Sequence, residues 1–234
     1  MLTGKCELLR LANYSCCASQ RTHMIEYSLR HSKNEKLRSS VLWSPNFNLD
    51  SFIRDVIIIK NVSEQYRAIF KNIMDLTFHQ LHGYQMLCNA LEKKRSTTYS
   101  KDDPNHEETL IKLWKLLYPD VPLKNRISKQ WCEIGFQGDD PASDFRGMGL
   151  LGLETMMWLD DLHDFTDFSV KGTWIRRLVL FRLQITHQGG RYPYALVSIN
   201  ITQMAYTFLL DGTLKNRFYN TIRGAPSTED FYDI

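Results

Sequence analysis

A single arginine, Arg146, lies between an Asp-Pro turn and two glycines in the stretch GFQGDDPASDFRGMG, residues 135–149. A guanidinium is always charged, and its planar fork of donors suits phosphate oxygens. The glycine on its C-terminal side lowers steric bulk, so another protein's surface could approach the backbone closely. These are the requirements of an arginine donated in trans to a GTPase, where it can speed hydrolysis by roughly 10³–10⁵-fold.

The alternative is a tight structural turn, in which Arg146 folds back to pair with Asp140 or Asp144. Physical chemistry alone favours this second interpretation of the arginine. Asp139, Asp140 and Asp144 could also suggest a magnesium site or an acid/base pair. However, Asp-Pro and Ser-Asp are preferred in turns and at helix N-caps, so the residues themselves favour turn roles.

Other patterns in the chain are weaker. His79 and His82 are spaced like two zinc ligands and Cys88 follows, but no second pair lies near them in the sequence, so we predict no metal site. The sequence contains no G-x-x-x-x-G-K-[ST], so the chain does not resemble a P-loop nucleotide hydrolase. Glycines 147, 149 and 152 mimic a dinucleotide fingerprint, which we reject because the upstream residues do not read as a strand.

Composition sets the broad class. The chain has 234 residues, a formal net charge of +3 and 43% hydrophobic residues, which is ordinary for a globular protein and too mildly basic for a typical nucleic-acid binder. No apolar run reaches the roughly 18–20 residues of a membrane-spanning helix. The start, MLTGKCELLRLANYSCC, lacks the pattern of a signal peptide. The cysteine number is odd, and we expect reduced thiols in the cytosol at Cys6, Cys16, Cys17, Cys88 and Cys132.

Helices must position the Arg146 stretch. Apolar spacing predicts one helix over about 64–93, closed by basic residues that suit the negative end of a helix dipole. A second helix is predicted to begin at Asp102-Asp103-Pro104, which offers an N-cap followed by proline at the first helical position. Pro119 and Pro122 are expected to end this helix.

Two more helices are predicted after the Arg146 stretch. One runs from about Leu150 to Leu162, and another follows Asn200-Ile201-Thr202. The buried face of the latter is expected at Met204, Ala205, Phe208 and Leu209. The segment 174–185, WIRRLVLFRLQI, fits a strand or a helix equally well. The fold class predicted from these patterns is mainly α.

The sequence also resembles a known family. Residues 127–154, ISKQWCEIGFQGDDPASDFRGMGLLGLE, are similar to the signature W-x-x-I-G-F-Q-x-x-x-P-x-x-D-F-R-G-x-G of the ELMO (engulfment and cell motility) domain. The similarity extends upstream through HEETLIKLWKLLYPDVPLKNRISKQW and resumes in YPYALVSINITQMAYTFLL at 192–210. The amino-terminal TGKCELLR and SQRTHMIEYSL resemble the short ELMO-domain-containing proteins rather than the larger scaffolds.

This resemblance implies a function. Short members are mainly helical cytosolic proteins that activate GTP hydrolysis by GTPases of the Arf and Arf-like families. Arg146 matches the motif arginine taken as their catalytic finger, and Gln137, Asp140 and Asp144 match motif positions expected to give structural or docking support. The GTP-bound partner would supply nucleotide, magnesium and the water-positioning residue, so the chain itself would need no cofactor and would regulate an enzyme rather than be one.

An alternative function remains open. The larger ELMO scaffolds work with Dock-type exchange factors in Rac signalling and lack that activity, so the chain could be a non-catalytic interaction domain. We expect cytoplasmic localisation, with peripheral attachment to organelle membranes through the partner left open.

The expected domain organisation has three parts. They are a polar, basic helical extension over 1–45, a helical segment over 46–100 that packs on the core, and an ELMO-like domain over 101–234. Relatives continue with further helix beyond Asp233-Ile234, so this domain is expected to be short at its C-terminus, and residues 164–185 depart from the family's usual pattern.

Overall fold

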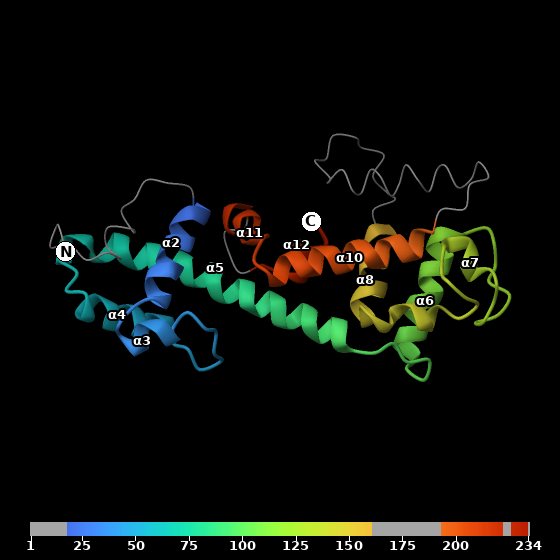
Figure 1. Cartoon of the computed structure of the whole chain (residues 1–234), viewed down its shortest axis with the longest axis horizontal. Helices are drawn as coiled ribbons and strands as arrows, with labels where there is room; N and C mark the ends of the chain where they lie inside the picture. The colour runs from blue at the N-terminus through green and yellow to red at the C-terminus, as the bar shows by residue number, and fades with distance from the viewer. Residues whose placement is uncertain (1–17, 161–192, 222–225, 234) are drawn as a thin grey trace. The chain divides into compact units, whose positions relative to one another are not determined.

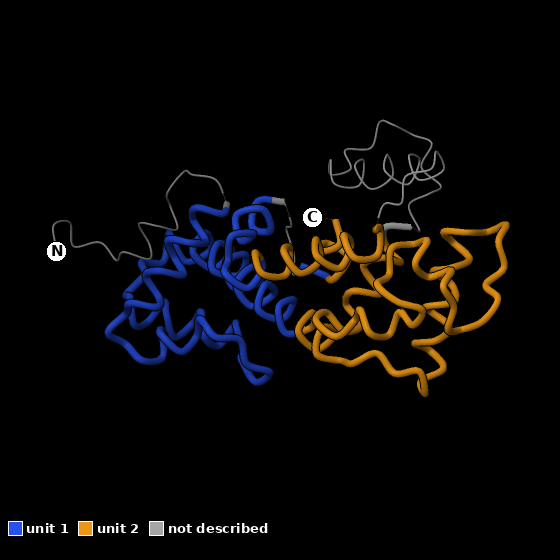
Figure 2. Tube along the Cα trace, turned by 45° about the vertical axis from the view of Figure 1, so that its right-hand side comes forward, with its two compact units in different colours: residues 1–89, 209–227 blue, residues 90–208, 228–234 orange. Residues whose placement is uncertain are grey.

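The computed structural model describes residues 18–160, 193–221 and 226–233, and all regular structure in these ranges is helical (Figure 1). This confirms the prediction of a mainly α fold. The chain divides into two compact units (Figure 2): unit 1 comprises residues 1–89 and 209–227, and unit 2 comprises residues 90–208 and 228–234. The three-part organisation expected from the sequence stays a prediction.

Unit 1 is built on the first part of the longest helix. Its helices are α2 (Ala18–Arg30), α3 (Glu35–Ser39), α4 (Leu49–Ile59), α5 (Glu64–Ser96, as far as Asn89) and α11 (Lys215–Thr221). Asn34 and Asn48 cap α3 and α4, because each side chain accepts a hydrogen bond from a backbone N–H in the first turn. The core between these helices is apolar and contains Ile25, Leu29, Leu37, Val41, Phe52, Ile53, Val56, Phe70, Met74 and Phe78.

Buried polar groups fix the register of unit 1. Thr22 donates to the Gln80 side chain at 2.5 Å, and Gln80 donates to the carbonyl of Tyr219 at 2.8 Å, which links α2, α5 and α11. Glu26 on α2 pairs with Arg30 at 2.8 Å and with Lys215 of α11 at 3.0 Å. Burial alone would raise the pKa of the Glu26 carboxyl, but the hydrogen bonds from these two cations hold it below its ordinary value.

Unit 2 contains the Arg146 stretch. Its helices are the end of α5, α6 (Pro104–Leu117), α7 (Trp131–Ile134), the 3-10 helix η1 (Pro141–Arg146), α8 (Gly149–Asp160), α10 (Tyr194–Leu210, as far as Phe208) and α12 (Thr228–Tyr232). α8 packs against both α6 and η1. Ile199 of α10 lies 3.6 Å from where a Cβ on Gly152 of α8 would stand, so α8 and α10 are in close contact.

The short helix α12 completes unit 2 from a distant part of the chain. Phe231 is buried, and the Tyr232 hydroxyl donates to the Glu154 carboxylate of α8 at 2.8 Å. Lys94, near the end of α5, pairs with the same carboxylate and donates to the Tyr232 hydroxyl at 3.3 Å. Residues separated by as many as 138 positions therefore meet at one carboxylate.

The helices expected from local signals form as predicted. The helix expected over 64–93 is α5, with Lys93, Lys94 and Arg95 in its last turn. In α6 the Asp103 side chain accepts from the N–H of Asn105 at 2.9 Å, which confirms the predicted N-cap. The helix expected from about Leu150 is α8. The segment 174–185 lies outside the described residues. No helix in the described part of the chain is long and apolar enough to cross a membrane.

The prediction for α10 was wrong in two respects. The helix begins at Tyr194, so Asn200-Ile201-Thr202 lies inside it rather than before it. Leu209 is buried, but Met204 and Phe208 are 48% and 40% exposed. The physical reason is that nearly every turn of YALVSINITQMAYTFLL carries apolar residues on more than one side, so periodicity alone cannot choose the face that is buried.

Candidate functional site

The candidate site is the loop that carries Arg146. Asp140 begins η1 by accepting a hydrogen bond from the N–H of Ala142 at 3.0 Å, and Pro141 occupies the first helical position. Arg146 is the last residue of η1 and is exposed to solvent. Gly147 follows it, and α8 begins two residues later at Gly149.

Buried neighbours hold Arg146 in place. Phe145 is 1% exposed and Met148 is 2% exposed, whereas Arg146 and Gly147 between them face solvent. The Phe145 ring lies 5.4 Å from the Tyr99 ring and 5.8 Å from the Phe136 ring. Aromatic rings packed at these separations resist displacement. The backbone on both sides of the arginine is therefore anchored, while its side chain is presented outward.

Arg146 is unpaired within the described part of the chain. Among residues 18–160, 193–221 and 226–233, no hydrogen bond or ion pair to its guanidinium is formed. Asp140 instead binds Arg126 at 2.9 Å, and Asp144 accepts from the backbone N–H of Gln137 at 2.7 Å. The interpretation in which Arg146 folds back onto Asp140 or Asp144 is therefore not what the structure shows.

Both aspartates do perform the turn roles that the sequence favoured. Asp140 caps η1, and Asp144 ties the start of the loop to its end through the Gln137 backbone. The other carboxylate oxygen of Asp144 accepts from the Ser143 hydroxyl at 3.1 Å. The side chain of Gln137 is exposed on the same short loop. The sequence motif thus contains two residues that shape the loop and two, Gln137 and Arg146, whose side chains face outward.

A partly buried arginine that the sequence did not single out, Arg126, supports the loop through two ion pairs. Arg126 binds Glu107 at 2.6 Å through Nε and Asp140 at 2.9 Å through Nη1. Its guanidinium lies 5.8 Å from the centre of the Tyr99 ring, and the Tyr99 hydroxyl donates to Glu107 at 2.5 Å. Partial burial alone would raise the pKa of Asp140, but the Ala142 N–H and Arg126 hold it below its ordinary value.

Comparison with known proteins matches this loop to a family. The sequence profile of the ELMO/CED-12 family matches residues 89–232, which is more than half of the chain and includes the whole loop. The chain belongs to the ELMO/CED-12 family. This confirms the resemblance seen in the motif around Arg146.

Curated relatives extend the match to nearly the whole chain. ELMO domain-containing protein 1 of Bos taurus is 39% identical, over 98% of this chain and 72% of that protein. ELMO domain-containing protein 2 of Homo sapiens is 41% identical, over 100% of this chain and 75% of that protein. ELMO domain-containing protein B of Dictyostelium discoideum is 29% identical, over 100% of this chain and 79% of that protein. No solved structure shows a significant match.

The remaining candidates for chemistry in this ELMO-family chain have ordinary roles. His82 bonds the Ser40 carbonyl at 2.8 Å and His79 bonds the Asp75 carbonyl at 2.7 Å, both within unit 1. Cys88 is half-buried, and burial raises the pKa of its thiol to about 11. Within the described ranges, no group of three histidine, cysteine or carboxylate side chains is placed to hold a metal ion.

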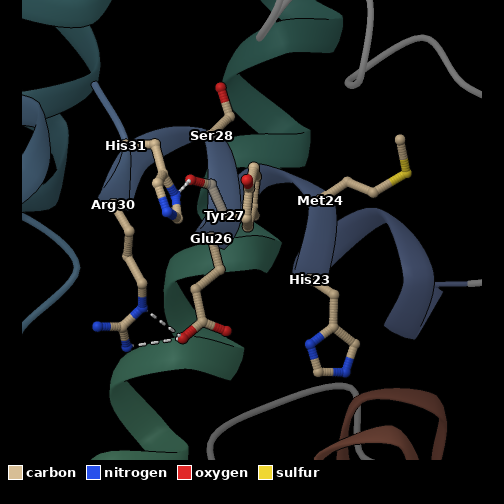
Figure 3. Close-up of a pocket in the computed structure, with 7 residues that line it drawn as sticks. All are labelled: His23, Met24, Glu26, Tyr27, Ser28, Arg30 and His31. Carbon is tan, nitrogen blue, oxygen red and sulfur yellow. Dashed lines mark hydrogen bonds and ion pairs between the residues drawn. The ribbon is translucent and has the colours of Figure 1, made fainter. Parts of the chain in front are cut away.

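A depression along α2 in unit 1 offers no comparable candidate, because its charged pair and its two histidines have partners within unit 1 (Figure 3). Its lining includes Glu26, which is paired with Arg30, as the dashed lines in Figure 3 show. His31 bonds the Tyr27 carbonyl at 2.8 Å, and His23 bonds Asn216 at 2.9 Å. Glu26, through its pairing with Lys215, and His23 join α2 to α11, whereas the His31 bond lies within α2, so we assign these side chains a structural role.

Removing the Asp140 carboxylate is expected to destabilise the protein by about 1 kcal/mol, because the N-cap of η1 and the pairing with Arg126 are lost together. The measurement is urea unfolding of Asp140→Ala followed by tryptophan fluorescence. The folded pKa of Asp140 lies below its ordinary value of 3.8. The loss in free energy of unfolding relative to the wild type should therefore be largest above pH 3.8 and should vanish as the pH falls through the folded pKa. The exposed neighbour provides the control: Asp139→Ala should change stability by less than about 0.5 kcal/mol.

Proposed function

We propose that this chain is a GTPase-activating protein for small GTPases of the Arf and Arf-like families, with Arg146 acting in trans as the arginine finger. The proposal rests on one observation above the others. Arg146 is exposed, unpaired among the described residues, and held between the buried anchors Phe145 and Met148. A charge presented in this way is already placed for a partner's phosphates and need not break an internal ion pair first.

The chemistry follows from the guanidinium. In the transition state of GTP hydrolysis, negative charge is spread over the oxygens of the transferred phosphoryl group and of the leaving diphosphate. A planar fork of N–H donors can bind two of these oxygens at once. A gain of 10³–10⁵-fold corresponds to about 4–7 kcal/mol of the barrier. The partner GTPase would hold the nucleotide and magnesium and position the attacking water.

The other motif residues then have separate roles. Asp140 and Asp144 would act by shaping the loop, since their carboxylates are already used within it. Gln137 would contact the partner directly, because its side chain amide is exposed beside the loop. Arg126 and Glu107 would serve as the rigid base on which the loop is carried.

Substitution of Gly147 tests independently whether the partner GTPase comes close to the backbone beside Arg146. Its backbone has φ −82° and ψ −36°, which any residue adopts, and among the described residues nothing lies within 4 Å of where a Cβ would stand. The fold itself therefore gives no reason for glycine at this position. We expect Gly147→Val to leave the melting temperature nearly unchanged while lowering the stimulation of GTP hydrolysis at least about tenfold, because the side chain would stand between Arg146 and the partner. Full activity of a folded Gly147→Val protein would show that no partner surface comes this close.

The function is tested by single-turnover GTP hydrolysis. A panel of GTP-loaded Arf and Arf-like GTPases is followed with and without this chain, and binding is measured in parallel with a non-hydrolysable GTP analogue. Stimulation of one or more members would support the proposal and identify the partner. Binding without stimulation, from a sample shown to melt cooperatively, would favour a non-catalytic interaction domain instead.

A further inference from the structure

A group of exposed apolar side chains surrounds the turn between α4 and α5 in unit 1. Ile58 is 76% exposed, Ile69 is 52%, Ile59 is 42% and Tyr66 is 39%. We call these four residues the apolar tip. They lie within twelve consecutive positions of the sequence, at the end of α4 and in the first turns of α5. Single exposed apolar residues are common on protein surfaces, but four around one turn are not scattered.

The turn that carries the apolar tip is well formed. The N–H of Val62 donates to the Ile57 carbonyl at 3.0 Å, and the N–H of Lys60 donates to the Val56 carbonyl at 2.9 Å. Val62 is 2% exposed, and Asn61 adopts the left-handed conformation with φ 47° that closes the turn. The apolar side chains are therefore held outward by a fixed backbone rather than by fraying of a helix end.

The core of unit 1 explains why these residues are left outside. α4 already packs Phe52, Ile53 and Val56 inward, and successive helical residues are separated by about 100°, so Ile57, Ile58 and Ile59 cannot all face one side. Tyr66 and Ile69 are three positions apart and share a face of α5. Both lie in the first turns of α5, where residues 64–69 are all exposed, and Phe70 is the first residue of this helix that is buried in the core.

The charges around the apolar tip favour a negatively charged partner. Residues 54–71 contain four basic and two acidic side chains. One of the acids, Asp55, is paired with Lys36, and one of the basic residues, Lys71, is paired with Asp50, which leaves Arg54, Lys60 and Arg67 against Glu64. Arg54 is exposed, Lys60 stands within the turn, and Arg67 donates through Nε to the Val62 carbonyl at 3.3 Å beside the tip. The combination of outward apolar side chains with flanking Arg and Lys is the pattern of a surface that enters the interface of an anionic bilayer.

We propose that the apolar tip inserts into the headgroup region of anionic membranes and attaches this chain peripherally, without need of the GTPase. A bilayer suits the feature better than a protein partner, because a stable protein interface uses roughly 20–30 residues per side, whereas the tip offers four. Interfacial insertion needs only a few apolar side chains together with favourable charge. This inference is independent of the GTPase-activating proposal.

The test is sedimentation of the full chain with sucrose-loaded vesicles, in the absence of any GTPase. Vesicles of phosphatidylcholine containing about a third phosphatidylserine are compared with pure phosphatidylcholine at low salt. We expect binding to the anionic vesicles, weakened by added salt. The double variant Ile58→Ser/Ile69→Ser should lower the partition coefficient at least about tenfold. Arg54→Gln/Lys60→Gln should weaken binding to the anionic vesicles and leave the small binding to neutral ones unchanged.

A matched control lies in unit 2. Ile127 is 62% exposed, so Ile127→Ser removes one comparably exposed isoleucine, half the number changed in the double variant, from another site and should leave vesicle binding unchanged. Circular dichroism and melting curves confirm that each variant is folded. Equal binding by the wild type and by Ile58→Ser/Ile69→Ser, or no binding by the wild type, would overturn the proposal. So would a wild-type dimer in light scattering that the same double substitution converts to a monomer without any vesicle binding, since the tip would then join two copies of the chain.

Discussion

Arg146→Lys is expected to lower the rate of GTP hydrolysis stimulated by this chain by about 10³-fold or more. The lysine retains the positive charge but loses the planar fork, so it cannot bind two phosphoryl oxygens at once. The loss should fall on the single-turnover rate constant, with little change in the concentration of chain that gives half-maximal stimulation. An interaction role alone would produce the opposite result, in which binding weakens and no catalytic step is lost.

Folding should be unaffected by the same substitution. Arg146 is exposed and makes no hydrogen bond or ion pair among the described residues, so the free energy of unfolding should change by less than about 0.5 kcal/mol. Arg54→Lys is the matched control, because Arg54 is also an exposed arginine, but it lies within α4 in unit 1. It should retain full stimulation in an assay without vesicles. Wild-type stimulation of GTP hydrolysis by the Arg146→Lys protein would disprove the proposal that Arg146 is an arginine finger.

Gly149→Ala is expected to destabilise unit 2 by about 3–5 kcal/mol, the largest effect on stability of any substitution considered for the loop. Gly149 adopts φ +52°, which costs roughly 1–2 kcal/mol for a residue with a Cβ. The added carbon would stand 2.2 Å from the Arg95 carbonyl oxygen and 2.5 Å from that of Thr97. Backbone must move to relieve this overlap, which would break the hydrogen bond from Leu150 N–H to the Thr97 carbonyl at 3.0 Å.

Thermal melting followed by circular dichroism measures this effect. A loss of 3–5 kcal/mol corresponds to a fall of roughly 6–20 °C for a chain of this size. Gly147→Ala is the natural comparison, since it adds the same methyl group two residues earlier, where nothing among the described residues lies within 4 Å. Equal melting temperatures for the two alanine variants would contradict the predicted overlap between a Cβ at position 149 and the carbonyl oxygens of Arg95 and Thr97.

These two glycines show where prediction from the sequence reaches its limit. In the sequence both belong to the same glycine-rich stretch, and nothing distinguishes them. Only the backbone conformation and the neighbouring carbonyls reveal that Gly149 is required by the fold, whereas Gly147 is not. The difference depends on residues 95 and 97, which lie more than fifty positions away.

The helix ends predicted from neighbouring residues were confirmed, because the interactions that fix them act over short stretches of sequence. The Asp103 cap, the proline at the start of α6 and the basic end of α5 involve residues within one or two turns of each other. The prediction that Asp140 and Asp144 shape a turn also succeeded for this reason. By contrast, Arg126 joins Glu107 and Asp140 across 19 and 14 positions, and no periodicity links three such residues. The support beneath the candidate site therefore had to come from the structure.

The position of α12 has a consequence for the order in which the chain can fold during synthesis. Unit 1 needs residues 209–227, and unit 2 then needs 228–234, which bring Tyr232 to Glu154 and Lys94. A ribosome that adds about 5–20 residues per second would thus synthesise nearly all of this chain before either unit could complete its fold. Long-range contacts of this kind also slow folding. Truncation before Thr228 should accordingly leave a nascent chain that chaperones hold longer, even though Arg146 and its loop have already been made.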